Sequence, residues 1–189
     1  MRFVFNEKKA AQAAAHVLHR HGGRFNYMHL IKELYLADRQ SLIDRGVPIT
    51  GDSMFAMKHG PVLSNILDAV SHGPDADSEW ARLISEPAGY AVSLLVSNPP
   101  DGALSEYEIE VLDTVDTEYG SMNVFELVEL LHETLPEWDA PGLSSKPIDP
   151  ETILSATRQP AAKIEQARQA AAETAFFHEN TCPWCHQMV

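Results

Sequence analysis

Residues 50–62 have the sequence TGDSMFAMKHGPV, and they lie between two segments that carry helical patterns. This stretch has no helical pattern of its own. It begins with turn residues around Gly51. It ends in Gly60, which can adopt a positive φ, and Pro61, whose φ is preset for the first turn of a helix. We therefore expect a turn, a short strand over residues 53–58, a tight corner and a helix start, with the remaining helices packed around this insertion.

Two helices are expected before the central stretch. Residues 6–21 show alanine-rich helical spacing, with Asn6 as the cap, and two glycines follow them. Residues 25–45 carry the strongest helical pattern in the chain, with Asn26 as the N-cap and Gly46 immediately after the last turn. A long helix is therefore expected to end shortly before the central stretch begins.

The chain after the central stretch contains a change of period. A helix is expected at residues 61–72, whereas residues 82–84 and 90–96 favour two strands joined by a turn. Because a lone hairpin is marginal in water, residues 53–58 are the expected third strand. The predicted class is mainly α, a helical domain of six or seven helices with a small three-stranded antiparallel sheet. The remaining helices are expected at residues 105–119, 123–134, 149–159 and 161–178.

Composition limits the function classes. The chain has 189 residues, 44% of them hydrophobic, so it can bury a core without disulfides. Its formal net charge of −13 argues against a nucleic-acid partner, because phosphate contacts need clustered Lys and Arg, and it suits a basic protein partner. The N-terminus shows no apolar signal segment, and no apolar run is long enough to span a membrane. We expect a cytoplasmic protein with no membrane partner, and the sequence leaves a homo-oligomer open.

Several pieces of sequence occur in an order that carries more information than any one of them. They are LIKELYLADR at 30–39, PITGD at 48–52, AMKHGPV at 56–62, LSE at 104–106 and Trp138. Together they resemble the Panacea domain of SocA-type antitoxins. The resemblance covers about residues 5–140.

The resemblance implies a mostly helical domain with a small sheet that binds and neutralises a cognate protein toxin. SocA itself delivers its toxin to the ClpXP protease, so a proteolytic adaptor is a second mechanism that the resemblance leaves open. On this basis the chain divides into a Panacea-like domain at residues 1–140, a helical extension at 141–178 and a Cys/His-containing tail at 179–189.

Two interpretations of the central stretch remain open. In the first, it is a toxin-binding surface. The residues predicted to contact the toxin are Met54, Phe55, Lys58, His59, Tyr35 and Asp38. In the second, the stretch exists to shape the backbone, and its side chains fill the core. The residues predicted to be structural are Gly51, Asp52, Gly60, Pro61 and Trp138.

The tail contains the only two cysteines of the chain, Cys182 and Cys185, followed by His186. Two thiolates at this spacing form half of a tetrahedral zinc site, to which His186 or His178 can add a ligand. The same spacing also fits c-type haem attachment, a redox pair or free thiols in a terminal segment. Zinc is therefore the predicted cofactor, if the chain has one.

Other chemistry receives less support. His16 and His19 stand three residues apart on a helix, a spacing that permits a metal pair. The chain has no nucleophile elbow, phosphate-binding glycine loop or zinc-protease motif, so we expect no enzymatic activity. The alternative class is a winged-helix-like DNA-binding regulator of its own operon, built from the first two helices and the hairpin.

Overall fold

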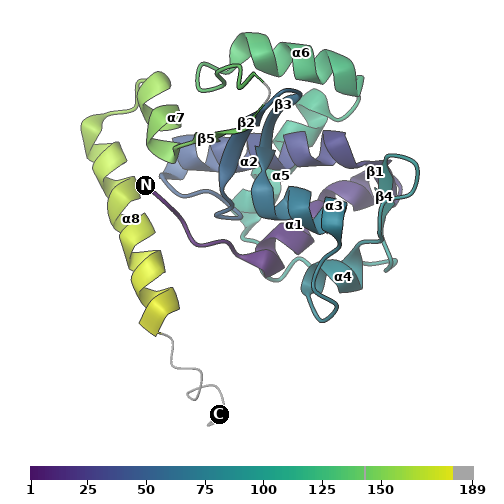
Figure 1. Ribbon diagram of the computed structural model, residues 1–189. Helices are drawn as coiled ribbons and strands as arrows, with labels where there is room; N and C mark the ends of the chain where they lie inside the picture. Colours follow the sequence, from purple (N-terminus) through teal and green to yellow (C-terminus); the bar gives the residue numbers. More distant parts are fainter. Residues whose placement is uncertain (143, 181–189) are drawn as a thin grey trace.

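Helix α2 (Tyr27–Arg45) forms the centre of the fold, and α1 (Glu7–Arg20) and α5 (Glu106–Tyr119) pack against it (Figure 1). The computed structural model describes residues 1–142 and 144–180. Every residue from His29 to Asp38 is buried, so α2 is covered on all its sides rather than along one stripe. The polar residues of this helix must therefore find their partners inside the protein.

Two small antiparallel sheets lie around the helices. In the first, β2 (Met54–Met57) pairs with β3 (Gly60–Leu63) on one side and with β5 (Lys146–Ile148) on the other. Met54 stands opposite Leu63 in one ladder and opposite Ile148 in the other. The second sheet pairs β1 (Arg24–Asn26) with β4 (Ala91–Ser93).

The remaining helices cover the outside of this arrangement. Figure 1 shows α6 above the three-stranded sheet and α7 and α8 on the side where the chain begins. No helix in the described ranges combines the length and the apolar character needed to cross a membrane. The bounds of these helices are α3 (Ser64–His72), α4 (Glu79–Leu83), α6 (Val124–Thr134), α7 (Pro150–Ala156) and α8 (Ala161–Asn180).

The mainly α class with a small three-stranded sheet is confirmed, with eight helices among the described residues. The helix starts agree where a side chain caps the backbone. Asn26 accepts hydrogen bonds from the N–H groups of the first turn of α2, and Ser105 forms the expected capping box with Glu108. Asp149 caps α7, with Pro150 at its first position.

The predicted partners of the central strand are wrong. Residues 53–58 were expected to pair with residues 82–84 and 90–96, yet β2 pairs with β3 and β5. The reason lies in Gly60, whose φ of +89° turns the chain straight back along β2. Pro61 consequently lies in β3, an edge strand in which a missing N–H interrupts no inner ladder, and α3 begins only at Ser64.

The second expected strand segment is partly helical. Arg82 and Leu83 belong to α4, because the Ser78 hydroxyl caps that helix by accepting a hydrogen bond from the Ala81 N–H over 3.1 Å. Ile84 still forms an isolated bridge with Leu94, but β4 takes β1 as its partner. Strand β5 lies between α6 and α7 and ends immediately before Asp149, the N-cap of α7.

Candidate functional site

The tip of the β2–β3 hairpin is the most exposed part of the central stretch. Lys58 and His59 form the two-residue turn and are both exposed, whereas Gly60 is buried. Both turn residues have negative φ and Gly60 has positive φ, the pattern of a type I turn followed by a left-handed glycine. The turn therefore presents two cationic or ionisable side chains to solvent on a corner that glycine makes possible.

A buried lysine supports the tip from below. The Lys32 ammonium donates a hydrogen bond to the Pro61 carbonyl over 2.7 Å, and the side chain is 1% exposed. Burial lowers the pKa of Lys32 to about 7. A Cβ at position 60 would stand 3.3 Å from the Lys32 nitrogen, so a glycine there also lets the strand approach the lysine. The corner is thus fastened from α2.

An aromatic pair closes the tip on the side of α6. The rings of His132 and Trp138 stack with centroids 3.8 Å apart, and the Trp138 indole donates to the Met57 carbonyl over 3.2 Å. His132 Nε2 is buried and has no hydrogen-bond partner in the part of the chain that is described. Burial lowers the pKa of His132, and Lys32 and His59 lower it further. A neutral imidazole with a free nitrogen therefore lies beside the corner.

The start of the central stretch is fixed to α2 through Asp38. Its carboxylate accepts hydrogen bonds from the Thr50 N–H over 2.8 Å and from the Thr50 hydroxyl over 2.5 Å. Burial raises the pKa of Asp38 to about 7, although these hydrogen bonds oppose the shift. Asp38 is fully buried and therefore holds the loop rather than a partner.

A second network joins α2 to the segment after α6. The Tyr35 hydroxyl donates to Glu137 Oε1 over 3.0 Å, and the Arg39 guanidinium donates to both oxygens of the same carboxylate over 2.5 and 3.2 Å. Tyr35 is fully buried, and desolvation raises its pKa, with a further rise from the buried Glu137 carboxylate beside it. This network fixes the segment that carries Trp138.

Gly51 and Asp52 shape the entry to β2. Gly51 has a φ of +68°, and a Cβ there would collide with the Val4 carbonyl oxygen. Asp52 accepts hydrogen bonds from the backbone N–H groups of Asn65 and Ile66 over 3.1 and 3.0 Å. The residue at the N-cap of α3 itself makes no side-chain cap, so Asp52 supplies it from a distant part of the chain.

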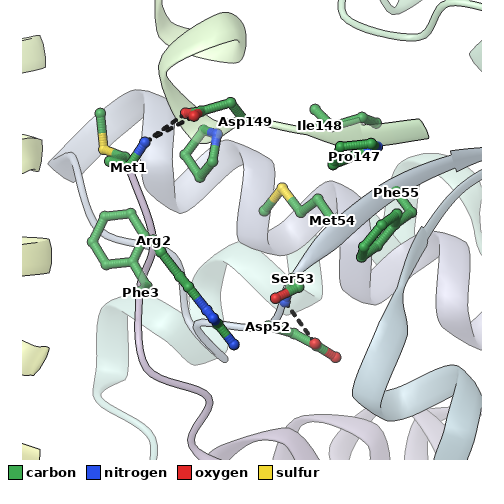
Figure 2. A pocket seen from close by; sticks show the side chains of 11 residues that line it. Met1, Arg2, Phe3, Asp52, Ser53, Met54, Phe55, Pro147, Ile148 and Asp149 are labelled. Carbon is green, nitrogen blue, oxygen red and sulfur yellow. Dashed lines mark hydrogen bonds and ion pairs between the residues drawn. The ribbon is translucent and has the colours of Figure 1, made fainter.

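A cavity of about 430 Å³ lies at the other end of β2, between the N-terminal segment and β5 (Figure 2). Met54 and Phe55 line it, and the Met1 amino group closes one side by pairing with the Asp149 carboxylate at 2.9 Å. Met54 is 3% exposed and points into the core, whereas Phe55 is half-buried. The two neighbours thus face opposite sides of the strand, as strand geometry requires.

The structure separates the six predicted toxin-contact residues into two groups. Lys58 and His59 are exposed and Phe55 is half-buried, so these three can meet a partner. Three lie inside the protein, each less than 4% exposed: Met54, Tyr35 and Asp38. The residues predicted to be structural all shape or hold the backbone. Gly51 and Gly60 adopt positive φ, and Pro61 lies in β3. Asp52 and Trp138 hydrogen-bond to backbone groups.

Two residues, Lys32 beneath the tip and Phe125 on α6, were not identified from the sequence as part of a site. The burial of Lys32 follows only from the elements that cover α2. Phe125 is 76% exposed on α6. It stands seven residues before His132, so the two share one face of the helix about 10 Å apart. The buried stripe of Leu127 and Leu131 leaves Phe125 out, and that signal was present in the sequence.

The predicted metal ligands of the tail lie mostly outside the described residues. Cys182, Cys185 and His186 are beyond them, and His178 is exposed near the end of α8. Of the histidine pair on α1, His16 lies 2.8 Å from the Asp113 carboxylate. The zinc prediction for the tail stays a prediction.

Comparison with known proteins identifies the class to which this fold and hairpin belong. The family described as antitoxin SocA-like, Panacea domain, matches residues 30–139. The chain therefore belongs to the SocA-like antitoxin family with a Panacea domain. No curated protein and no solved structure matches the chain.

Proposed function

We propose that this antitoxin neutralises a cognate protein toxin by direct contact through a surface that we name the hairpin platform, made of Lys58, His59, Phe125 and His132. The family assignment supports the toxin partner in general, and the geometry of the hairpin supports the contact surface. The role is binding rather than catalysis.

One observation carries this proposal: the hairpin is held from inside on both sides of its exposed tip. Lys32 holds the Pro61 carbonyl and Trp138 holds the Met57 carbonyl, so the turn between them is fixed before any partner binds. A preorganised surface loses less conformational entropy on binding than a flexible loop does. Lys58 and His59 are the side chains that this fixed turn presents.

The charge of the platform differs from that of the chain. The whole protein carries a formal charge of −13, which attracts a basic toxin over long range. The tip places a lysine and a histidine where a carboxylate of the toxin can pair with them. Phe125 adds an exposed aromatic ring of the kind that dominates contact energies in protein interfaces.

The experiment compares Lys58→Ala and His59→Ala with matched controls. Lys8→Ala and His72→Ala change an exposed lysine and an exposed histidine elsewhere on the surface. The candidate toxin is the product of the neighbouring reading frame, expressed alone and together with each variant. We expect the controls to rescue growth and the platform variants to fail with an unchanged melting temperature. Rescue by all four variants would remove the platform from the account.

We further propose that the C-terminal part of the chain can act as a proteolytic adaptor that delivers the bound toxin to ClpXP. Ala167 and Ala171 anchor α8 in the core, whereas Phe176 and Phe177 are 62% and 68% exposed toward its end. In Figure 1 this end of α8 extends past the body of the domain. Exposed apolar residues on such an extension suit a second protein partner.

Deletion of residues 179–189 tests the adaptor mechanism. The measurement is toxin half-life in cells, with toxin binding by the purified variant as the control for folding. We expect normal binding and slower toxin turnover. If binding and turnover are both unchanged, residues 179–189 have no part in delivery.

The DNA-binding alternative requires α2 to act as a recognition helix, and the burial of α2 does not support that role. A recognition helix must expose a face to the major groove, whereas α2 is buried from His29 to Asp38. Its one central cation, Lys32, donates to a backbone carbonyl inside the protein. A gel-shift assay with the upstream DNA at near-physiological salt is expected to show no complex.

A further inference from the structure

Three ionisable side chains from three helices meet away from the hairpin. His21 follows the last turn of α1, Glu33 lies on α2 and Asp116 lies on the last turns of α5. One nitrogen and two carboxylate oxygens from these residues all lie within 4.8 Å of one another. Imidazole and carboxylate are ligands that divalent transition metals accept.

Glu33 is the unusual member of this group. Its side chain is 0% exposed, and neither carboxylate oxygen has a hydrogen-bond partner among the described residues. His29 Nε2 lies 3.2 Å from Glu33 Oε1 without hydrogen-bond geometry to it, and instead bonds to the Tyr119 carbonyl over 3.1 Å. His29 can pair with Glu33 when its imidazole is protonated, but a buried carboxylate that accepts no hydrogen bond is costly, so a native protein is expected to supply a further partner.

The other two ligands are held in position by their neighbours. His21 Nε2 lies 2.6 Å from Asp116 Oδ1, and the imidazole stacks on the Phe25 ring with centroids 3.7 Å apart. The Arg20 guanidinium donates to the second oxygen of Asp116. These contacts restrain the ligands before a metal arrives, as outer contacts do at metal sites.

Gly120 leaves space beside the ligands. A Cβ at this position would lie 2.6 Å from both the backbone oxygen and Oδ1 of Asp116 and 3.1 Å from His21 Nε2. The close helix end therefore requires glycine, and the absence of a side chain also keeps this side of the cluster open. His21 is 22% exposed, which gives an ion a route from solvent.

We propose that His21, Glu33 and Asp116 form a binding site for a divalent transition-metal ion of the Zn²⁺ type. A tetrahedral ion with ligands 2.0–2.1 Å away separates them by about 3.3 Å, so His21 and Asp116 must move apart by less than 1 Å. The ion supplies the missing partner of Glu33 and links α1, α2 and α5. One imidazole among the ligands disfavours Mg²⁺, which prefers oxygen alone. This site is independent of the hairpin platform and of the tail.

The test uses the full chain with Cys182→Ser and Cys185→Ser, so that tail thiols do not bind the added metal. After treatment with a chelator and its removal, ZnCl₂ is titrated by calorimetry. Thermal unfolding is then followed without ZnCl₂ and at several ZnCl₂ concentrations above that of the protein. MgCl₂ serves as the hard-cation control. We expect one bound Zn²⁺ per chain and a melting temperature that rises with zinc concentration and not with magnesium.

Variants assign the binding to these residues. Glu33→Gln and His21→Gln are each expected to weaken zinc binding at least tenfold, whereas His16→Gln, which changes a histidine on the same helix outside the cluster, keeps it. Glu33→Gln removes a buried carboxylate that accepts no hydrogen bond, so its metal-free melting temperature should equal or exceed that of the parent. Zinc binding that survives Glu33→Gln, or a parent protein that binds no zinc, overturns the proposal and leaves a buried protonated glutamic acid.

Discussion

The base and the tip of the β2–β3 hairpin differ in how their polar groups are used. At the base, Asp38 and Asp52 are buried, and their carboxylates accept hydrogen bonds from backbone N–H groups. At the tip, Lys58 and His59 face solvent on a turn that Gly60 makes possible. The difference teaches that a recognisable sequence motif can be mostly scaffold. The residues that carry the family resemblance mostly build the corner, and its fully exposed side chains lie at the end.

The largest expected effect belongs to the base. Gly51→Ala places a Cβ against the Val4 carbonyl at a φ of +68° and should lower the free energy of unfolding by about 3 kcal/mol or more. Gly89→Ala is the matched control, because Gly89 also has positive φ but open space around it, and should cost about 1 kcal/mol. Urea denaturation measures both, and equal losses would show that the clash at Gly51 is not real.

A smaller loss is expected for Asp38→Ala. The substitution leaves the buried Thr50 N–H without an acceptor and should cost about 3 kcal/mol. Measured at about pH 4, where the Asp38 carboxyl is neutral in the folded protein, Asp38→Asn should cost less than about 1 kcal/mol, because its oxygen can accept from the N–H while its amide donates to the Thr50 hydroxyl. The comparison by urea denaturation isolates the hydrogen bonds from the shape of the side chain. Equal costs for the two variants would mean that the Thr50 contacts do not hold the loop.

The pH dependence of the free energy of unfolding should distinguish wild type from Asp38→Asn. Burial raises the pKa of Asp38 from 3.8 to about 7, so the neutral carboxyl stabilises the fold below about pH 3.8 and that contribution is lost as the pH rises toward 7. Wild type should therefore lose stability relative to Asp38→Asn by on the order of 4 kcal/mol across this window. Denaturation curves at several pH values, with a chelator present, measure the difference. A constant difference would place the Asp38 pKa near its ordinary value.

The tip should contribute the smallest effect on stability. Lys58→Ala and His59→Ala change exposed side chains and should each alter the free energy of unfolding by less than about 0.5 kcal/mol. If either variant lowers the free energy of unfolding by about 2 kcal/mol or more, the tip side chains stabilise the fold and the binding-surface interpretation is wrong.

Local signals in the sequence predicted the helices well. Asn26, Ser105 and Asp149 each cap a helix within three residues of their own position, so a short window contains the whole interaction. Strand partners were harder because pairing is non-local. β5 pairs with β2 across about 90 residues of chain, and nothing in the sequence around Pro147 indicates that partner.

The site could be predicted only in part for the same reason. Lys58 and His59 follow from the turn chemistry beside Gly60. The burial of Tyr35 and Asp38 depends on the elements that cover α2, and the meeting of Glu33 with His21 and Asp116 depends on three helices at once. Helical spacing assigns a face to such residues, but it does not say what packs against that face.

The most direct test of the central claim is toxin capture by the hairpin platform. The protein encoded beside this chain is purified as the candidate toxin, and its affinity is measured for wild type, Lys58→Ala, His59→Ala and the control Lys8→Ala. We expect both platform variants to lose at least tenfold in affinity while keeping the melting temperature of wild type. Unchanged affinity in both platform variants, beside a toxin that wild type binds and neutralises, would contradict it.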